Sequence, residues 1–459
     1  MDLGIAFTSG VPLRRQLEHA LRAAIRSGRL TAGAVLPSTR DLAEELGVSR
    51  GVVVDSYAQL AAEGYLSAKR GSGTRVALLP DLIGSPAMRQ LATPSLFRYD
   101  LRPGLADFHA FPRERWKAAL SGALRDLPDA RLTYAGHRGV PELRNAVAEY
   151  LARARGVVTE PDYVVVCCAA SHALVTIWQA LRRQGARRVA VEDPGWRWQR
   201  FTVEQAGLEA VPVRVDADGL VVTELAAANV DAVVLTPAHQ YPTGVVMTAE
   251  RRGALLAWAR RRQALIVEDD YDVEYRYGRE PVASLQGLAP DRVAFIGTTS
   301  KILAPAMRLA WMVPPAHLID GVEQELQVTG ATPPTLDQIA MATFIRDAAL
   351  ERHLRSMRRR YRAKRQLLLD ALAQHIPDVR VGGTAAGLHL LAWLPEGVDE
   401  RKAAMLARSS EVGFHELHRH CTVRAQFPPA FLLGYALPSE SDLITATKLI
   451  ADAIDRSVG

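Results

Sequence analysis

One lysine, Lys301, has sequence neighbours that favour a reactive amine over an amine exposed to solvent. It follows an apolar, strand-like segment at residues 293–296, and its neighbours Ile302, Leu303 and Met307 are apolar. Partial desolvation of this kind lowers the pKa of an amine and makes the neutral, nucleophilic form available. Such an amine can form a Schiff base with a carbonyl compound. The alternative is a loop lysine exposed to solvent, and this stretch alone does not decide between the two.

The residues around this lysine also suit a phosphate group. Hydroxyls precede it at Thr298, Thr299 and Ser300, and a guanidinium follows it at Arg308. Hydroxyl and guanidinium groups are strong partners for phosphate oxygens. An amine and a phosphate site on one stretch indicate a phosphorylated carbonyl cofactor, and pyridoxal phosphate (PLP) has both groups.

A second stretch combines an apolar strand with acidic residues. The run at residues 264–267 ends abruptly in Glu268, Asp269 and Asp270, followed by Tyr271. In open α/β sheets the ligand crevice lies beyond the carboxyl ends of the strands. A carboxylate there can keep a pyridine nitrogen protonated, which tunes PLP as an electron sink. The alternative is a solvated acidic loop, but the lysine that follows the next strand-like segment favours a cofactor site.

Three further segments carry weaker signals. A strand-like run at residues 164–168 leads through Ala170 and Ser171 into a helix, whose first backbone N–H groups can hold a phosphate. Trp196 follows a strand and a turn, where its ring could cover a cofactor face. Tyr134 lies in a loop before an amphipathic helix. The alternatives are an ordinary crossover, a tryptophan packed in a loop and a simple loop.

The length and patterning of the chain predict several domains. At 459 residues it exceeds one ordinary core. Helix-like and strand-like segments alternate from residue 101 to residue 459, which predicts an α/β fold with a largely parallel sheet. At residues 77–100 periodicity fades and prolines recur, as in a semi-rigid linker. Residues 1–76 form a separate N-terminal segment.

This N-terminal segment has the pattern of a helix-turn-helix. Residues 13–27 carry apolar side chains at helical spacing and end before Gly28. Ser38 can cap a second helix that Gly47 ends, and Ser49 can cap a third. Two short helices joined by a glycine-containing turn describe a helix-turn-helix. Its second helix enters the major groove of DNA with its N-terminal end.

A β-hairpin is predicted after these helices, at residues 67–76, with Gly71 and Gly73 at its turn. Lys69 and Arg70 on this wing would contact DNA phosphates, which position a protein without reading sequence. The alternative is a small helical domain with ordinary surface charges.

Residues 1–76 closely resemble the winged helix-turn-helix of GntR-type bacterial regulators. The matching runs are Leu-Pro-Ser-Thr-Arg-Asp-Leu-Ala, Gly-Val-Ser-Arg, Glu-Gly-Tyr-Leu and Gly-Ser-Gly-Thr. The resemblance implies contacts with double-stranded operator DNA from Arg40, Ser49, Arg50 and the wing around Gly71 to Gly73.

Nearly all of residues 100–459 resemble fold-type I aminotransferases, and the joined architecture resembles the MocR family of bacterial regulators. The matching segments are Thr236 to Gly244, Glu268 to Tyr271, and Ser300-Lys301 with Arg308. The implied fold is an α+β winged helix-turn-helix followed by an α/β PLP-dependent aminotransferase-like domain with a smaller C-terminal α+β subdomain. Fold-type I proteins are dimers with sites at the interface, so the resemblance also implies a homodimer.

The same resemblance implies roles for individual residues. Lys301 would be the Schiff-base lysine, Asp269 would face the pyridine nitrogen, Tyr271 would lie near the ring hydroxyl, and Trp196 would stack on the ring. The remaining implied cofactor-binding residues are Thr298, Arg308, Ala170 and Ser171 at the phosphate, Tyr134 from the second subunit, and His239.

The chain departs from the aminotransferase pattern, and the lack of one arginine weakens a claim to efficient transamination. Tyr241 stands where many aminotransferases have asparagine, and the strand at residues 431–436 lacks the arginine that usually binds the substrate carboxylate. Arg424 and Arg197 are the candidate substitutes for an effector carboxylate.

Composition restricts the remaining choices. The formal charge of +6 and the pI near 9.3 favour a polyanionic partner only mildly, and the three cysteines lack metal-site spacing. No run of eighteen uncharged apolar residues and no signal-peptide pattern occur. We therefore expect a cytoplasmic protein, nucleoid-associated when bound to DNA, with no metal and no membrane partner.

These observations predict a PLP-dependent transcription regulator that binds operator DNA and senses PLP, or a PLP–amine adduct, through Lys301. It would control genes of vitamin B6 metabolism or of amino-compound metabolism. The alternative is a catalytically active aminotransferase with an attached DNA-binding domain. A third reading, a regulator that has lost PLP, is disfavoured because Lys301, Asp269, Tyr271 and Arg308 are all present.

Overall fold

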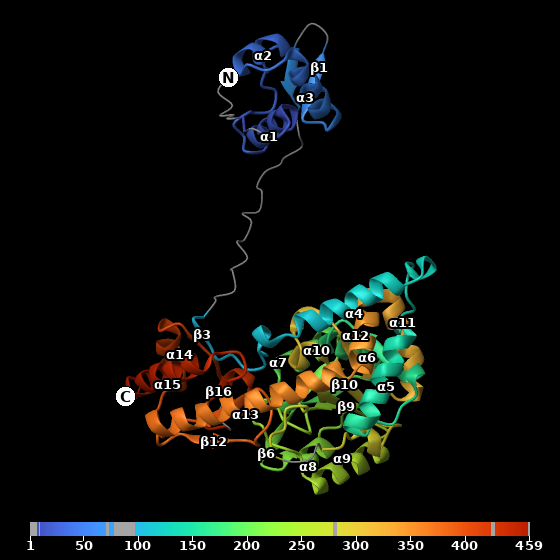
Figure 1. Cartoon of the computed structure of the whole chain (residues 1–459), viewed down its shortest axis with the longest axis vertical. Coiled ribbons are helices and arrows are strands. Elements are labelled where there is room, and N and C mark those ends of the chain that lie inside the picture. Colours follow the sequence, from blue (N-terminus) through green and yellow to red (C-terminus); the bar gives the residue numbers. More distant parts are fainter. Residues whose placement is uncertain are drawn as a thin grey trace. The chain divides into compact units, whose positions relative to one another are not determined.

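The computed structural model describes residues 7–8, 10–69, 73–77, 97–278, 282–423 and 427–457, with the side chains of residues 68 and 69 left out. The chain divides into two compact units, Met1–Ser95 and Leu96–Gly459. Figure 1 shows the elements of both units.

The first unit consists of three helices and a β-hairpin. The elements are α1 (Leu13–Arg26), α2 (Thr39–Leu46), α3 (Arg50–Ala62), β1 (Leu66–Lys69) and β2 (Gly73–Val76). The two strands pair antiparallel. Leu17, Leu21, Leu42, Val53 and Leu60 are fully buried in one cluster, so this small unit has its own core.

The turn between α2 and α3 is set by local chemistry. The Ser38 hydroxyl accepts a hydrogen bond from the Asp41 N–H, 3.2 Å away, as predicted for a capping serine. Gly47 ends α2 with a left-handed φ of 64°, which glycine adopts without strain. Ser49 occupies the N-cap position of α3, but its side chain makes no capping bond there, so the prediction of a hydroxyl cap at Ser49 is wrong.

The second unit is built on a mixed sheet of eight strands. Its strands, in spatial order, are β4 (Val165–Cys167), β11 (Ala310–Val313), β10 (Val293–Thr298), β9 (Leu265–Asp270), β8 (Ala232–Leu235), β5 (Arg188–Asp193), β6 (Glu209–Asp216) and β7 (Gly219–Leu220). The neighbours from β10 through β9, β8 and β5 to β6 pair in parallel, whereas β11 pairs antiparallel with both β10 and β4. The prediction of an α/β fold with a largely parallel sheet is confirmed.

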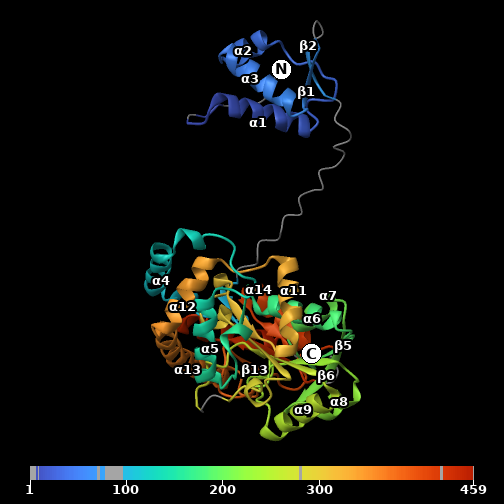
Figure 2. The same ribbon diagram turned by 90° about the vertical axis from the view of Figure 1, so that its right-hand side faces the viewer.

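Helices cover both faces of this sheet because successive strand side chains point to opposite faces. Ala294 and Ile296 of β10 pack in one cluster with α6 and α11, whereas Phe295 packs in another with α5 and α12. Figure 2 shows α8 and α9 side by side near β6. The helices are α4 (Arg113–Asp126), α5 (Pro141–Arg155), α6 (Ala170–Arg183), α7 (Arg197–Gln205), α8 (Val222–Ala227), α9 (Ala249–Arg262), α10 (Thr299–Ile302), α11 (Ile319–Thr329) and α12 (Thr335–Arg346).

The C-terminal part forms a smaller α+β subdomain, reached through the long helix α13. An antiparallel sheet has the order β12-β13-β16-β15. Its elements are α13 (Ala349–His375), β12 (Arg380–Gly382), β13 (His389–Trp393), α14 (Glu400–Ser409), β15 (His415–Glu416), β16 (Ala430–Gly434) and α15 (Glu440–Asp455).

The second unit begins inside the segment predicted to be a linker. Strand β3 (Tyr99–Asp100) pairs in parallel with β14 (Val412–Gly413), which ties residues 99–100 to the subdomain. The central part of the predicted linker, residues 78–96, lies outside the described residues. Within the described part of the chain, no helix is both long and apolar enough to cross a membrane.

Candidate functional site

A cavity of about 250 Å³ surrounds Lys301. It lies at the carboxyl ends of the parallel strands, because Asp269 is the penultimate residue of β9 and Lys301 lies three residues after the end of β10. The predicted site residues that line it together are Lys301, Asp269, Tyr271, Trp196, Ala170, Ser171, Thr298 and Arg308. The fold therefore gathers into one cavity residues that lie far apart in the sequence.

The Lys301 amine is placed for reaction with a carbonyl group. It lies in the one-turn helix α10, and its Nζ donates a hydrogen bond to the backbone carbonyl of Gly104, 2.8 Å away. Burial lowers the pKa of this amine, while the negative charges of Asp272 and Asp269 act in the opposite direction. The net effect favours the neutral, nucleophilic form more than in a lysine exposed to water.

Asp269 has an unfilled bonding position that tests the fit of PLP. Its Oδ2 accepts a hydrogen bond from Gln199 Nε2, 2.9 Å away. Its Oδ1 is buried without a hydrogen-bond partner among the described residues. Burial raises the pKa of this carboxyl to about 6, and Gln199 opposes the change. A protonated pyridine nitrogen is the kind of donor that a buried, unpaired carboxylate oxygen requires. The residues present therefore fit the cofactor.

We expect Asp269→Ala to weaken PLP binding by at least about tenfold, because a buried charge-assisted hydrogen bond is lost. Titration of the full chain with PLP, followed by absorbance, measures this change. Asp126→Ala, which removes an exposed carboxylate, is the matched control and should bind PLP like the wild type. Equal affinity of Asp269→Ala and the control would contradict the placement of Asp269.

The Tyr271 hydroxyl is oriented by His239, which is itself hydrogen-bonded to Asp272. The Tyr271 hydroxyl lies 3.1 Å from His239 Nδ1, which also lies 3.0 Å from Asp272 Oδ1. An ionised carboxylate can only accept, so Nδ1 carries the proton and the Tyr271 oxygen accepts from it. The hydroxyl proton of Tyr271 is then available for donation into the cavity. His239 thus reaches the cavity through Tyr271 rather than lining it.

The other end of the cavity has the composition of a phosphate site. Ala170 and Ser171 begin the fourteen-residue helix α6, whose first N–H groups have no partners within the helix. The Thr298 hydroxyl accepts from the Ser300 N–H, 3.2 Å away. Arg308 adds a positive charge, and its φ of 50° is an uncommon value for a residue other than glycine.

Besides His239, the predicted residues Tyr134 and Arg197 are not among those that line this cavity. Tyr134 is fully exposed, so it does not line the cavity of its own chain. Arg197 is exposed at the start of α7 and borders a separate small cavity with Arg419 and His420. Arg424 lies outside the described residues.

Three residues at or behind the site were not predicted from the sequence: Gln199, Gly104 and Asp272. Gln199 follows Trp196 by one helical turn, so a search for polar residues one turn after the predicted aromatic could have found it. Gly104 contributes only a backbone carbonyl, which has no signal in the sequence. Asp272 directly follows the predicted acidic motif, and its spacing gave no indication of the contact with His239.

A buried acid, Glu192, stands behind the cavity at the end of β5. Its Oε2 accepts from the N–H and the hydroxyl of Thr236, at 3.0 and 2.7 Å. Burial raises the pKa of this carboxyl from the usual 4.5 to about 8, and the bonds from Thr236 oppose the change. The folded chain therefore binds more protons than the unfolded chain between these pH values, and stability falls as the pH rises through them.

We expect Glu192→Gln to reduce this pH dependence, because glutamine keeps the shape and does not titrate. Between pH 5.5 and 7.5, the wild type should lose more free energy of unfolding than the variant, by about 1–2 kcal/mol. Chemical denaturation followed by circular dichroism at the two pH values measures the difference. Glu160→Gln, at an exposed site, should behave like the wild type. Parallel losses in Glu192→Gln and the wild type would contradict this interpretation.

In the first unit, the predicted DNA-contacting residues of the helices share one exposed region. Arg40 lies in the first turn of α2, and Ser49 and Arg50 lie at the start of α3; all three are exposed. Arg50 Nε lies 3.4 Å from the hydroxyl of Thr39 and donates to it, which links the starts of the two helices. This arrangement presents hydroxyl and guanidinium groups at the N-terminal end of the second helix of the motif.

The wing is described only in part. Gly73 opens β2 with a φ of 78°, and the backbone of Lys69 pairs with it across the hairpin. Arg70 and Gly71 lie outside the described residues, and the Lys69 side chain is not described.

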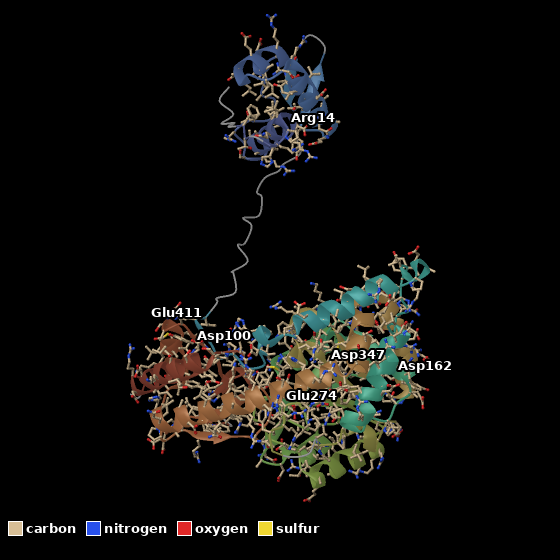
Figure 3. The ribbon with its side chains drawn as sticks, in the orientation of Figure 1. Arg14, Asp100, Asp162, Glu274, Asp347 and Glu411 are labelled. Atoms are coloured by element: carbon tan, nitrogen blue, oxygen red, sulfur yellow. The ribbon has the colours of Figure 1, made fainter. Side chains whose placement is uncertain are left out.

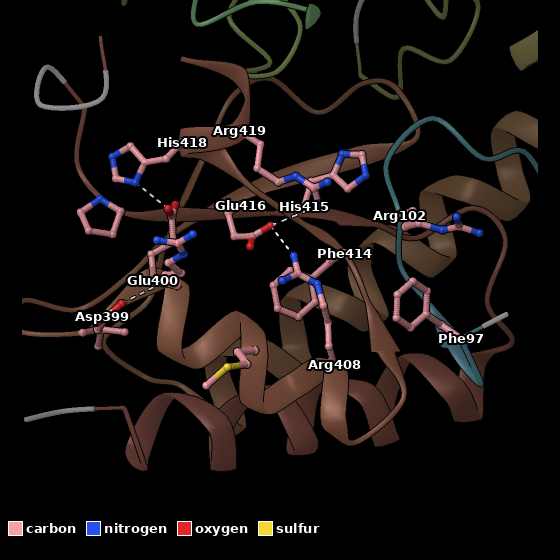
Figure 4. A pocket seen from close by; sticks show the side chains of 14 residues that line it. Phe97, Arg102, Asp399, Glu400, Arg408, Phe414, His415, Glu416, His418 and Arg419 are labelled. Carbon is pink, nitrogen blue, oxygen red and sulfur yellow. Dashed lines mark hydrogen bonds and ion pairs between the residues drawn. The ribbon is translucent and has the colours of Figure 1, made fainter. Parts of the chain in front are cut away.

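A second cavity, of about 940 Å³, lies in the C-terminal subdomain and contains none of the predicted site residues (Figure 4). Two of its acids, Glu400 and Glu416, have side-chain partners. Glu400 Oε2 lies 2.5 Å from His418 Nδ1, and Glu416 Oε2 accepts from Arg408, also at 2.5 Å. None of the described residues that line this cavity has a buried side-chain polar atom without a hydrogen-bond partner, in contrast to Asp269 in the Lys301 site.

The fold and site thus define a class: a winged helix-turn-helix joined to an aminotransferase fold with a lysine in its cofactor cavity. The family model for bacterial regulatory proteins of the gntR family matches residues 13–76, and that for aminotransferase class I and II matches residues 106–413. Among solved structures, kynurenine aminotransferase from Pyrococcus horikoshii has a TM-score of 0.72 at 24% identity, covering 80% of this chain and 92% of that one. At this identity, the likeness shows the fold alone.

Curated relatives match most of the chain. The probable rhizopine catabolism regulatory protein MocR of Rhizobium meliloti is 35% identical, over 93% of this chain and 90% of that one. The pyridoxine biosynthesis transcriptional regulator PdxR of Corynebacterium glutamicum is 34% identical, over 84% and 85%.

The chain belongs to the MocR and PdxR type of GntR-family regulators. It is a transcription regulator with a DNA-binding helix-turn-helix domain and an aminotransferase-like domain, whose family implies PLP as the cofactor.

Proposed function

We propose that this regulator changes its affinity for operator DNA when PLP, or an adduct of PLP with an amine, occupies the cavity around Lys301. The observation that carries the proposal is the convergence of three groups in one cavity. They are the partly buried amine of Lys301, the unpaired oxygen of Asp269 and the cation of Arg308. When bound, PLP supplies an electrophilic carbonyl carbon and an electron-withdrawing ring.

Each residue has a distinct part in this proposal. Lys301 would hold the cofactor through its amine, and Asp269 would accept a hydrogen bond from the ring nitrogen. Tyr271, oriented by His239, would donate to the ring hydroxyl. Trp196 covers one ring face. The phosphate is held by Ala170, Ser171, Thr298 and Arg308, with Tyr134 contributed by the second subunit.

Each domain has its own role in this function, and the protein is a dimer. Residues 1–76 bind operator DNA, and residues 101–459 bind the effector and dimerise. Residues 77–100 link the domains, with the last two paired in β3 to the second unit. The protein acts as a cytoplasmic homodimer and associates with the nucleoid when bound to DNA. An effector that carries a carboxylate would be bound by Arg424 or Arg197.

The physical basis is linkage: a ligand changes DNA affinity only as far as it binds two conformers differently. Operator affinity should therefore be measured for the cofactor-free protein, with PLP, and with PLP plus each member of a panel of amino compounds. We expect at least one addition to change the affinity by about fivefold or more. A response to PLP alone would identify PLP as the effector.

The same preparations distinguish a regulator from an enzyme. Rapid turnover of an amino donor, together with an operator affinity that no addition changes, would contradict the proposal and favour an aminotransferase with a DNA-binding appendage. Slow conversion of a donor is compatible with a regulator, because sensing requires binding rather than turnover.

A further inference from the structure

Arginines gather around a cavity of about 500 Å³ beside α13 that the proposed function does not use. The arginines that line it are Arg276, Arg352, Arg355, Arg358, Arg359 and Arg362. No carboxylate lines it among the residues that the structure describes. Its volume lies in the range of small-molecule sites.

The helix brings most of these arginines together by spacing alone. Arg352, Arg355, Arg359 and Arg362 recur every three or four residues, so they lie on one face of α13. This row extends about 15 Å along the helix axis. All four are exposed, while residues such as Leu354 bury the inner side of the helix.

The charges in this row are not neutralised within the described part of the chain. Arg352, Arg355, Arg359 and Arg362 form no ion pair with a carboxylate of that part. Nearby Arg360, in contrast, pairs with Asp107, with Nε and Oδ2 3.0 Å apart. A guanidinium stays protonated at every relevant pH, so the row keeps its positive charge.

Two further arginines are held in position by backbone carbonyls. Arg358 Nε donates to the carbonyl oxygen of Glu274, 2.8 Å away, and Figure 3 shows Glu274 beside α13. Arg276 Nη1 donates to the carbonyl oxygen of Ala238, 3.2 Å away. A carbonyl orients a guanidinium without cancelling its charge. A solvent-exposed helix face would explain the row of exposed arginines. It would not explain why Arg358 and Arg276, which also line the cavity, are oriented by backbone carbonyls.

We propose that this cavity binds a compact oligophosphate, such as the phosphate chain of a nucleotide or free inorganic tripolyphosphate. Guanidinium groups bind phosphate oxygens through paired N–H donors, and several of them along a row match several linked phosphates. A DNA duplex carries its phosphates on a convex surface and does not enter a cavity of this size.

The position of the site couples it to the cofactor cavity. Residues 271–277 run from Tyr271, which lines the cofactor cavity, to Arg276 and Tyr277, which line the arginine cavity. The Tyr277 hydroxyl donates to the carbonyl oxygen of Gly387, 2.5 Å away. A side chain at Gly387 would clash with His239, so this glycine packs against the group behind Tyr271. We expect an oligophosphate bound here to change the affinity for PLP through this segment, as far as it binds two conformers of the segment differently.

The test is calorimetric titration of the full chain with inorganic tripolyphosphate in metal-free buffer, with PLP present at saturation. We expect one site per chain. The triple variant Arg352→Gln, Arg355→Gln, Arg359→Gln should weaken it by at least about tenfold, since several charge-assisted bonds are lost. The matched control changes the exposed arginines of α9, Arg260→Gln, Arg261→Gln and Arg262→Gln, and should stay within about twofold of the wild type. The corresponding triple lysine variant keeps the charge and should give an intermediate affinity.

Several results would overturn the proposal. One is that the wild type does not bind tripolyphosphate. Another is that the triple glutamine variant binds tripolyphosphate as tightly as the wild type does. A third is that orthophosphate binds as tightly as tripolyphosphate. If the wild type does not bind tripolyphosphate and the triple glutamine variant loses operator affinity, the arginine row contacts DNA instead. A PLP affinity unchanged by tripolyphosphate would overturn the coupling. Operator response to PLP is a separate measurement, so failure of this site leaves the proposed function to its own test.

Discussion

Lys301→Ala is expected to abolish covalent attachment of PLP and to leave at most weak, reversible binding. Lys301 is the one lysine that lines the cofactor cavity among the described residues, and burial lowers the pKa of its amine toward the reactive neutral form. The purified wild type should show the visible absorbance band of lysine-bound pyridoxal, and borohydride should fix the cofactor to Lys301. The variant should show neither property.

The fold should survive this substitution, because the amine makes a single hydrogen bond to a backbone carbonyl. Lys402→Ala, at an exposed helix position, is the matched control and should keep the band. A variant that retains the band would show that another amine holds the cofactor. That result would contradict the assignment of the cavity.

Arg50→Ala is expected to weaken operator binding by roughly tenfold to a hundredfold without changing PLP affinity. The guanidinium lies at the exposed start of α3, where a recognition helix contacts base edges. If Arg50 reads bases, the loss on operator DNA should exceed the loss on a random duplex. Fluorescence anisotropy at fixed salt measures both affinities.

Arg29→Ala, which removes another exposed arginine of the first unit, is the control and should change operator binding little. Equal losses on operator and random DNA would assign Arg50 to phosphate contact. No loss on either would contradict the placement of the recognition helix.

The sequence predicted best those features that depend on neighbouring residues. The cap at Ser38, the helix end at Gly47 and the two strands that lead to Asp269 and Lys301 all follow from local chemistry and spacing. The cavity could be anticipated because parallel strands bring their carboxyl ends to one edge of the sheet.

Contacts between distant segments could not be predicted in this way. Gln199 lies seventy residues from Asp269, and Gly104 lies 197 residues from Lys301, so only the folded chain shows that they touch. The position of antiparallel β11 between β4 and β10 could not be predicted for the same reason, because strand order depends on packing rather than on local pattern. Tyr134 was predicted to reach the site from the second subunit, and its full exposure in its own chain leaves this a prediction.

The most direct test of the central claim compares operator affinity in wild type and Lys301→Ala, each with and without saturating PLP, at one salt concentration. If attachment at Lys301 transmits the signal, PLP should change the operator affinity of the wild type by about fivefold or more and leave that of the variant unchanged. Equal responses in the two proteins, or no response in the wild type to PLP or to any PLP–amine mixture, would contradict the account.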